Sequence, residues 1–405
     1  MNFPYFISKR VVSSTKGNFA STISKLAVIS ISTGLCAMIL SFFILGGFQR
    51  TIKDKIYDFK GHIEITKFTL GSSFNEQPIS RNKQTLDQIK QYDFVEHIQF
   101  FAHKAGMFKT KDEVEGVLFK GVSNDFSVNR FSSNLVEGRF IEFKDSLYSK
   151  EVVISKYLSR KLNLLIGDDI VIYFVQNPPR FRKLNIVGLY ETGMEEIDQS
   201  LVIGDLGLVQ RLNNWPDSLV GGYEVFLTDL ALSNKADEIL YAELNSDLYV
   251  QQVSEKFMQI FDWLELLDQN VVVFLVLILV VACFNMVSIL LILIMERTNM
   301  IGVLQSLGAT KQQIRKVFTY NGLLLIFKGV AWGNSIALIF AFLQDRYKII
   351  PLDAENYYMH YVPIYWDINS LLLINFLTIM LVYVSLGIPL TVVSRIKPIT
   401  ALKFD

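Results

Sequence analysis

Four long apolar stretches are the feature that most constrains how this chain folds. They cover residues 27–48, 271–295, 321–343 and 371–393 of the 405-residue sequence. A helix rises about 1.5 Å per residue, so each stretch can cross the roughly 30 Å hydrocarbon core of a bilayer. The first stretch exceeds the apolar core of a cleaved signal peptide, which is about 7–15 residues long. We therefore predict four uncleaved transmembrane helices.

The distribution of lysine and arginine predicts the orientation of these helices. Basic residues outnumber acidic ones in segments 1–26, 296–320 and 394–405, whereas loop 344–370 carries more acidic residues. Four crossings place the three basic segments on one side of the membrane, as expected for cytoplasmic loops. We therefore predict that both termini are cytoplasmic and that segment 49–270 lies outside, even though Lys328 interrupts the third stretch.

Segment 49–270 has the pattern of a water-soluble α+β domain. Residues 49–59 continue the first helix as a polar stalk, and helical spacing recurs at 155–164 and 205–212. The segment contains 33 acidic and 25 basic residues, which argues against binding to anionic lipid head groups. No sharp linker divides it into lobes. Alternating apolar and polar residues predict strands at 62–68, 98–110, 114–121, 170–175, 184–190 and 223–228.

Composition argues against several classes of function. The formal net charge is zero, so no basic field attracts nucleic acid. Both cysteines, Cys36 and Cys283, fall in apolar stretches, and the four histidines have no metal-ligand spacing. Glu195, Glu196 and Asp198 form a carboxylate cluster without a basic partner, which we interpret as a solvated loop. The sequence lacks a nucleotide-binding G-x-x-x-x-G-K-[ST] loop, so the chain cannot by itself be an ATPase of that type. Because the sequence also offers no catalytic constellation, we predict that the chain is not an enzyme.

Segment 296–320 has the pattern of a helical hairpin. Its first helix carries an apolar stripe of Met300, Ile301, Leu304 and Leu307. Gly308 follows at the position where helices end in a left-handed residue. Thr310 and Gln313 then form a capping box that begins a second amphipathic helix. Two interpretations fit: an element that transmits force from a cytosolic partner, and an interfacial hairpin without a partner.

Residues 176–183, QNPPRFRK, form a second candidate site between two predicted strands. Pro178 and Pro179 lack backbone donors, so this loop cannot simply continue a strand ladder. The loop, which includes Arg180 and Phe181, is either a protruding hairpin tip that binds a partner or an ordinary surface turn.

Beyond these patterns, nearly the whole chain resembles a known family of membrane proteins. Residues 263–310, ending in MERTNMIGVLQSLGAT, are similar to the second span and coupling helix of FtsX/MacB-like ABC permeases. The resemblance is closer to lipoprotein-releasing permeases of the LolC/LolE type. Further similar segments are 151–174, 191–212, 356–367 and the tail 395–405.

The resemblance implies a fold class, a location and a set of partners. The fold class is a membrane protein with four transmembrane helices and a large α+β periplasmic domain between helix 1 and helix 2, as in type VII ABC permeases. The location is the bacterial inner membrane. The implied partners are a LolD-like ATPase subunit that binds ATP and Mg²⁺, a second permease subunit, identical or different, a LolA-like periplasmic carrier, lipoprotein substrates and membrane lipid.

The resemblance also implies site residues. A coupling helix would dock the ATPase, the loop at 178–181 would correspond to the hook that recruits the carrier, and a lipid chamber would accept acyl chains. Two alternative functions remain: a MacB-like permease that exports drugs, peptides or toxins, and an FtsX-like transmitter that activates a cell-wall hydrolase. The coupling residues are Glu296, Arg297, Met300, Ile301, Leu304, Leu307 and Gly308; the chamber residues are Phe42, Phe43, Leu45, Val271, Phe274 and Leu275.

Overall fold

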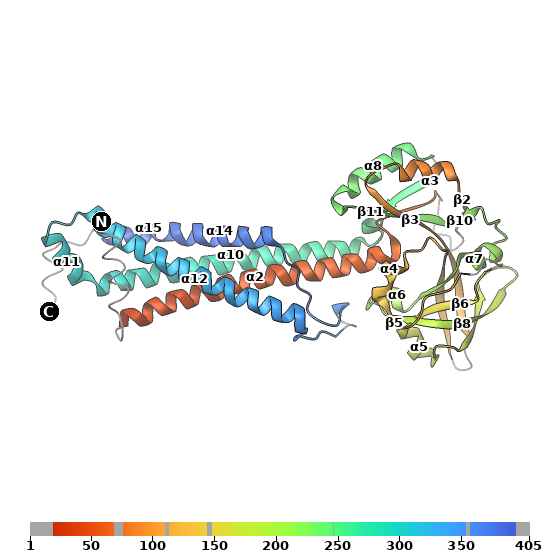
Figure 1. Ribbon diagram of the computed structural model, residues 1–405, viewed down its shortest axis with the longest axis horizontal. Helices are drawn as coiled ribbons and strands as arrows, with labels where there is room; N and C mark the ends of the chain where they lie inside the picture. The colour runs from red at the N-terminus through yellow and green to blue at the C-terminus, as the bar shows by residue number, and fades with distance from the viewer. Residues whose placement is uncertain are drawn as a thin grey trace. The chain divides into compact units, whose positions relative to one another are not determined.

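The computed structural model divides the chain into two compact units. The helical unit consists of Met1–Arg50, Trp263–Pro351 and Tyr361–Asp405; the sheet unit consists of Thr51–Asp262 and Leu352–His360. Figure 1 labels many of the elements of both units. The predicted tail 394–405 and the first 18 residues of the N-terminal segment lie outside the described residues, which are 19–68, 76–109, 113–143, 148–245, 247–353 and 357–393.

The structure confirms the prediction of four apolar helices. It also confirms a large α/β domain between the first and the second of them. The candidate spans are Thr22–Lys60, Met258–Glu296, Lys311–Tyr347 and Ile368–Thr391. A break at Leu386 separates the last two helices, because the ring of Pro389 excludes the Ser385 carbonyl from helical bonding. The helices are α2 (Phe19–Lys60), α10 (Met258–Glu296), α11 (Thr298–Ser306), α12 (Lys311–Tyr347), α14 (Ile368–Ser385) and α15 (Gly387–Val393).

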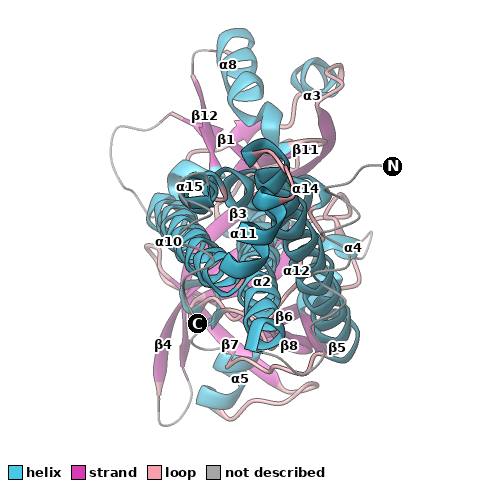
Figure 2. Cartoon of the chain, turned by 90° about the vertical axis from the view of Figure 1, so that its left-hand side faces the viewer, coloured by secondary structure: helices cyan, strands magenta, loops and turns pink. Residues whose placement is uncertain are grey.

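Small residues on α12 allow the helices to approach closely. Figure 2 looks along α2, α10 and α12 of this unit. A Cβ atom on Gly329 would lie 2.7 Å from the side chain of Ile31, and one on Gly333 would lie 2.9 Å from the Ser32 carbonyl oxygen. Lys328, beside Gly329, is exposed on the surface of this unit. The lysine therefore leaves the packing of α12 against α2 undisturbed.

Asparagine side chains join the spans. Asn334 and Asn375 exchange two hydrogen bonds between α12 and α14, at 2.6 and 2.9 Å. Asn285 of α10 donates to the Ser30 hydroxyl of α2 at 2.7 Å. Asn285, Asn334 and Asn375 are thus interhelical hydrogen-bond formers, a role that polar residues commonly take within membranes.

The sheet unit is built on one mixed ten-stranded sheet with the order β12-β1-β11-β3-β4-β9-β6-β8-β5, in which β7 pairs with β3 and β8. Short helices α3–α9 lie among the strands. The strands are β1 (Ile63–Lys67), β3 (Val95–Lys109), β4 (Val114–Val122), β5 (Leu135–Gly138), β6 (Glu151–Ser155), β7 (Asp169–Phe174), β8 (Arg180–Tyr190), β9 (Leu201–Asp205), β11 (Gly222–Leu227) and β12 (Leu248–Gln252), with β2 (Ile79–Ser80) and β10 (Leu219–Val220) as a separate pair. The helices are α3 (Lys83–Lys90), α4 (Val128–Phe131), α5 (Lys156–Leu162), α6 (Glu195–Asp198), α7 (Leu206–Leu212), α8 (Ser233–Glu243) and α9 (Val253–Lys256).

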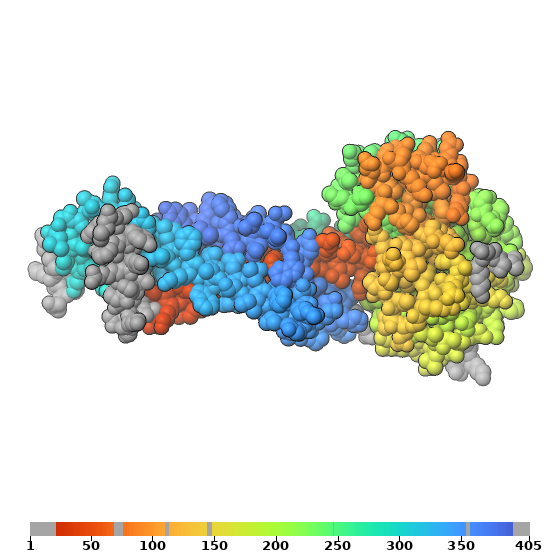
Figure 3. Space-filling model, in the orientation of Figure 1, coloured from red at the N-terminus to blue at the C-terminus, as the bar shows by residue number. Residues whose placement is uncertain are grey.

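Strand β3 explains why the sequence shows no boundary between lobes. Residues 95–101 of β3 pair with β11, and residues 102–109 pair with β4. One lobe therefore gathers around β11, β1 and β12, and the other around β4 to β9. Figure 3 shows the first lobe in orange and green and the second mainly in yellow. Because the two lobes share a continuous strand, no linker is needed between them.

Candidate functional site

The predicted hairpin at 296–320 forms as expected. Helix α11 ends at Ser306, and Gly308 follows with φ +93°. The Gly308 amide donates to the Gln305 carbonyl at 3.0 Å and the Ala309 amide to the Leu304 carbonyl at 2.9 Å, which is the Schellman pattern. Thr310 and Gln313 complete a capping box at the start of α12. The turn between the two helices is thus fixed at both ends by hydrogen bonds.

The apolar residues of α11 divide between two faces. Ile301 is fully buried and packs with Ile314 and Phe318 of α12, with Met300 half-buried beside them. Leu307 is 80% exposed and Val303 is 48% exposed. Glu296 is also exposed, whereas Leu304 and Arg297 are half-buried. The predicted apolar stripe therefore divides into a buried face, with Ile301, and an exposed face, with Leu307. Val303 belongs to the exposed face, although the sequence pattern did not include it in the stripe.

The loop at 176–183 is a tight turn between strands rather than a long protrusion. Arg180 begins β8 and pairs with Phe174 of β7, so only residues 175–179 lie outside the ladder. The Arg180 guanidinium donates to the carbonyl oxygens of Arg211 and Leu212, both at 3.1 Å, which ties the turn to α7. Pro178, Pro179 and Phe181 of this candidate hook are exposed. Phe181 is 63% exposed, and its ring lies 6.0 Å from that of Tyr173.

The predicted chamber residues separate in the structure. Phe42, Phe43 and Leu275 join one apolar cluster of α2, α10, α12 and α14. Phe43 is 1% exposed and its ring lies 5.5 Å from that of Trp366, so it packs inside the unit. Phe274 is 62% exposed, whereas Leu45 and Val271 are half-buried outside that cluster. Of the six, Phe274 presents the largest free apolar surface.

A buried charge cluster that the sequence analysis did not identify lies in the sheet unit, at the end of α2. Lys120 of β4 and Glu224 of β11 are 1% and 0% exposed, with Lys120 Nζ at 2.7 and 2.8 Å from the two Glu224 oxygens. Gln99 of β3, between them, donates to Glu224 at 2.7 Å, and Lys120 also donates to the Phe59 carbonyl. The buried carboxylate is thus neutralised and fully hydrogen-bonded.

More charged groups continue this cluster. Glu64 lies opposite Glu224 across β1 and β11, and Lys256 of α9 lies 2.7 Å from its carboxylate. Despite burial, the charges of Lys256 and Lys60 lower the pKa of Glu64 to about 2. Burial raises the pKa of Glu76 to about 7, although the His103 amide donates to it at 2.7 Å. The cluster therefore joins the last residue of α2 to four strands and to the segment that leads into α10.

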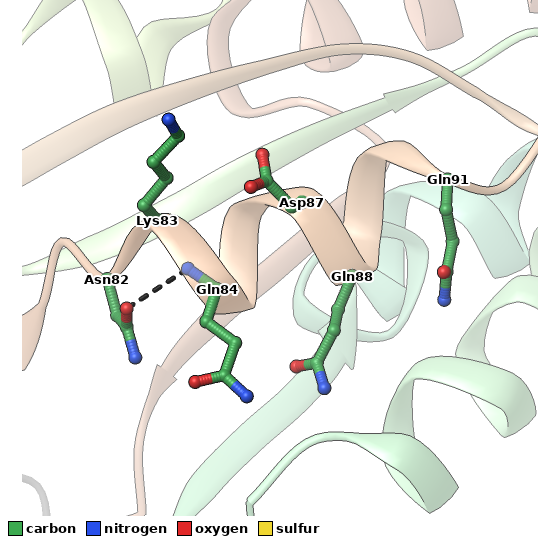
Figure 4. A pocket seen from close by; sticks show the side chains of 6 residues that line it. All are labelled: Asn82, Lys83, Gln84, Asp87, Gln88 and Gln91. Carbon is green, nitrogen blue, oxygen red and sulfur yellow. Dashed lines mark hydrogen bonds between the residues drawn. The ribbon is translucent and has the colours of Figure 1, made fainter.

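Two other polar regions lie in the sheet unit. Asp198 is buried, not solvated as predicted, because it accepts hydrogen bonds from the amides of Thr192 and Gly193. A shallow open depression follows the polar side of α3, where the side chains from Asn82 to Gln91 fan out to both sides instead of converging (Figure 4). Among the described residues, no group of three or more His, Cys, Asp or Glu side chains could hold a metal ion.

Comparisons with known proteins agree with this architecture. Residues 24–265 match the family model of the MacB-like periplasmic core domain, and residues 272–398 match that of the FtsX-like permease C-terminal region. The chain is 23% identical to the lipoprotein-releasing system transmembrane protein LolC of Neisseria meningitidis serogroup B, over 99% of both chains. It is 25% identical to LolC of Buchnera aphidicola, over 92% of this chain and 91% of that one.

A LolE protein is also similar to this chain. LolE of Haemophilus influenzae is 23% identical over 90% of both chains. Among solved structures, the periplasmic region of MacB from Actinobacillus actinomycetemcomitans aligns with 49% of this chain and 91% of its own, at 11% identity and a TM-score of 0.35.

Proposed function

The chain belongs to the family of permeases that combine a MacB-like periplasmic core domain with an FtsX-like C-terminal region, and from this premise we propose that it is a lipoprotein-releasing permease subunit of an ABC transporter. In this proposal a partner ATPase supplies the energy, and the complex extracts lipoproteins from the outer leaflet of the bacterial inner membrane. A periplasmic carrier then receives them. One observation carries the proposal: the relatives named for lipoprotein release align over 90% or more of both chains.

The energetics of extraction require such an arrangement. Each acyl methylene in the membrane contributes about 0.8 kcal/mol, so three chains of roughly 15 carbons hold an anchor with on the order of 35 kcal/mol. Removal of the anchor needs an apolar surface that replaces lipid and an external source of energy. The exposed apolar side of α10, which includes Phe274, Val273 and Leu277, supports the first requirement. In this proposal, the ATPase supplies the energy.

We assign the contact with the ATPase to α11 and its Schellman turn. Leu307 and Val303 form an exposed apolar face, while Ile301 anchors the helix to α12. A push on this face is transmitted to α12 because the turn is fixed at both ends. The assignment places both termini in the cytoplasm and the sheet unit in the periplasm.

Reconstitution tests the proposed function. The chain, a second permease subunit and the ATPase are placed in proteoliposomes with a triacylated lipoprotein, and the carrier is added outside. We expect transfer of the lipoprotein to the carrier that depends on ATP. Transport of drugs or peptides without such transfer would support the MacB-like alternative. Activation of a wall hydrolase without transport would support the FtsX-like alternative.

The hook has its own test. Replacement of Pro178 and Pro179 by alanine relaxes a turn that stands between two paired strands. If the turn recruits the carrier, carrier binding weakens while the ATPase activity of the complex stays unchanged. Phe181→Ser provides a second variant, because its side chain is exposed beside the turn. Unchanged carrier affinity in both variants would exclude this turn as a hook.

A further inference from the structure

The loop between α12 and α14 contributes to the sheet unit. Residues 352–360 group with that unit, although the helices on either side of the loop belong to the helical unit. The two ends of the loop pair with each other: Pro351 bridges to Tyr361, and the Leu352 amide donates to the His360 carbonyl at 2.9 Å. Met359 is 5% exposed. The chain therefore enters the sheet unit through this loop as well as through α2 and α10.

Lys55 of α2 holds this loop in place. Its ammonium donates to the Tyr358 carbonyl at 2.6 Å and to the Thr192 carbonyl as well. The carboxylates of Asp198 and Glu191 act electrostatically on the same ammonium. One cation thus joins three segments that are distant in sequence: the stalk of α2, the turn after β8 and the tip of the loop. Hydrogen bonds from an ionised donor are stronger than those between neutral groups.

The turn that receives the loop is shaped for close contact. Gly193 has φ +75°, and a Cβ atom there would lie 3.1 Å from the Tyr358 backbone. The Asp198 carboxylate fixes the turn by accepting from the amides of Thr192 and Gly193, at 3.1 and 2.9 Å. Glu191, next in the turn, lies 3.3 Å from Lys156 and 3.8 Å from His360 of the loop. The backbone contact of Gly193 with Tyr358 and the charge of Glu191 therefore act on the same side of the loop.

We propose that Lys55 is a positioning residue that clamps the 352–360 loop onto the sheet unit, so that movement of α12 and α14 reaches this unit directly and not only through the stalks. The clamp itself is inferred from the contacts of Lys55. Its role in transmitting movement from α12 and α14 to the sheet unit rests on the proposed function. The two parts are tested by separate measurements.

The first measurement is the labelling rate of a buried thiol. Met359→Cys is introduced into the full-length chain with Cys36 and Cys283 replaced by alanine, and reaction with a water-soluble maleimide is timed. We expect Lys55→Met to raise the rate at position 359 by at least about tenfold, since hydrogen bonds to a charged group are worth that factor or more. Lys53→Met, on the same helix, should leave the rate unchanged. Equal rates in the two variants would overturn the clamp.

Two further variants keep the result decisive. Tyr357→Cys, where the native side chain is 49% exposed, serves as a reporter that labels quickly in every background. If Lys55→Met does not fold, Lys55→Gln replaces it, because a shorter, neutral side chain removes the ammonium that donates to the Tyr358 carbonyl. Slow labelling of position 359 in folded Lys55→Gln would also overturn the clamp.

The second measurement uses the reconstituted complex. Lys55→Met should lower the lipoprotein released per ATP hydrolysed at least about threefold relative to Lys53→Met. Fast labelling with unchanged release per ATP would leave the clamp standing and overturn its role in transmission. Lack of ATP-dependent release by the wild-type complex would instead refute the proposed function and leave the labelling result valid.

Discussion

Replacement of Lys120 by methionine should strongly destabilise the sheet unit. Lys120 and Glu224 are 1% and 0% exposed, and the variant leaves the Glu224 carboxylate with one remaining donor, the Gln99 amide at 2.7 Å. Removal of one partner of a buried ion pair costs about 3–5 kcal/mol. For a unit of this size each kcal/mol lowers the melting temperature by about 2–4 °C, so we expect a decrease of about 6–20 °C. Thermal unfolding in detergent, followed by circular dichroism, measures it.

Two variants distinguish this reasoning from a general loss of packing. Lys120→Met combined with Glu224→Gln removes both charges, so it should recover at least about 1 kcal/mol relative to the single variant. Lys183→Met breaks an ion pair of similar length, 2.8 Å, whose side chains are 67% and 47% exposed. Because exposed pairs contribute little, this control should change stability by less than about 1 kcal/mol. A Lys120→Met protein as stable as the control, or a double variant no better than the single one, would refute the reasoning.

Three other predictions concern the hairpin, the spans and the response to pH. Gly308→Val should leave the spans folded but uncouple ATP hydrolysis from lipoprotein release. A Cβ atom at this position meets no neighbour, so the strain arises from φ +93° alone. Unchanged lipoprotein release per ATP hydrolysed would contradict this prediction. Asn334→Leu should cost about 1 kcal/mol in mixed-micelle unfolding, because it removes both hydrogen bonds that join Asn334 to the Asn375 amide. The double variant with Asn375→Leu should cost less, because it leaves no amide without its interhelical partner; a double variant less stable than both single variants would count against this. Glu76 has a pKa of about 7 in the folded chain against an ordinary 4.5, so ionisation opposes folding and its contribution to stability falls as pH rises from 4.5 to 7. The melting temperature of Glu76→Gln should therefore improve relative to wild type over that range, and a difference independent of pH would exclude the effect.

Local patterns predicted the parts of the fold that depend on neighbours in sequence. Hydropathy over about 20 residues located the four spans, and the residues from Gly308 to Gln313 predicted the break between α11 and α12. By contrast, β6 and β9 are short, nearly continuous apolar runs, whose period indicates neither a strand nor a helix.

Long-range contacts account for what the sequence could not show. Lys120 and Glu224 are 104 positions apart, and only the pairing of β11, β3 and β4 brings them together. Lys55 and the Tyr358 carbonyl are 303 positions apart, and a lysine in a polar stalk has no local feature that distinguishes it from Lys53. The buried position of Asp198 was not predicted, because two of its hydrogen-bond donors are the backbone amides of Thr192 and Gly193, which a sequence does not display.

The uninterrupted length of α2 has a mechanical consequence. Its 42 residues contain no break, so the helix is about 63 Å long, roughly twice the thickness of the hydrocarbon core. A rod of this length that tilts by about 5° around one end displaces the other end by roughly 5 Å. This displacement is larger than the rise of three helical residues. A continuous helix therefore converts a small tilt at one end into a larger shift at the other.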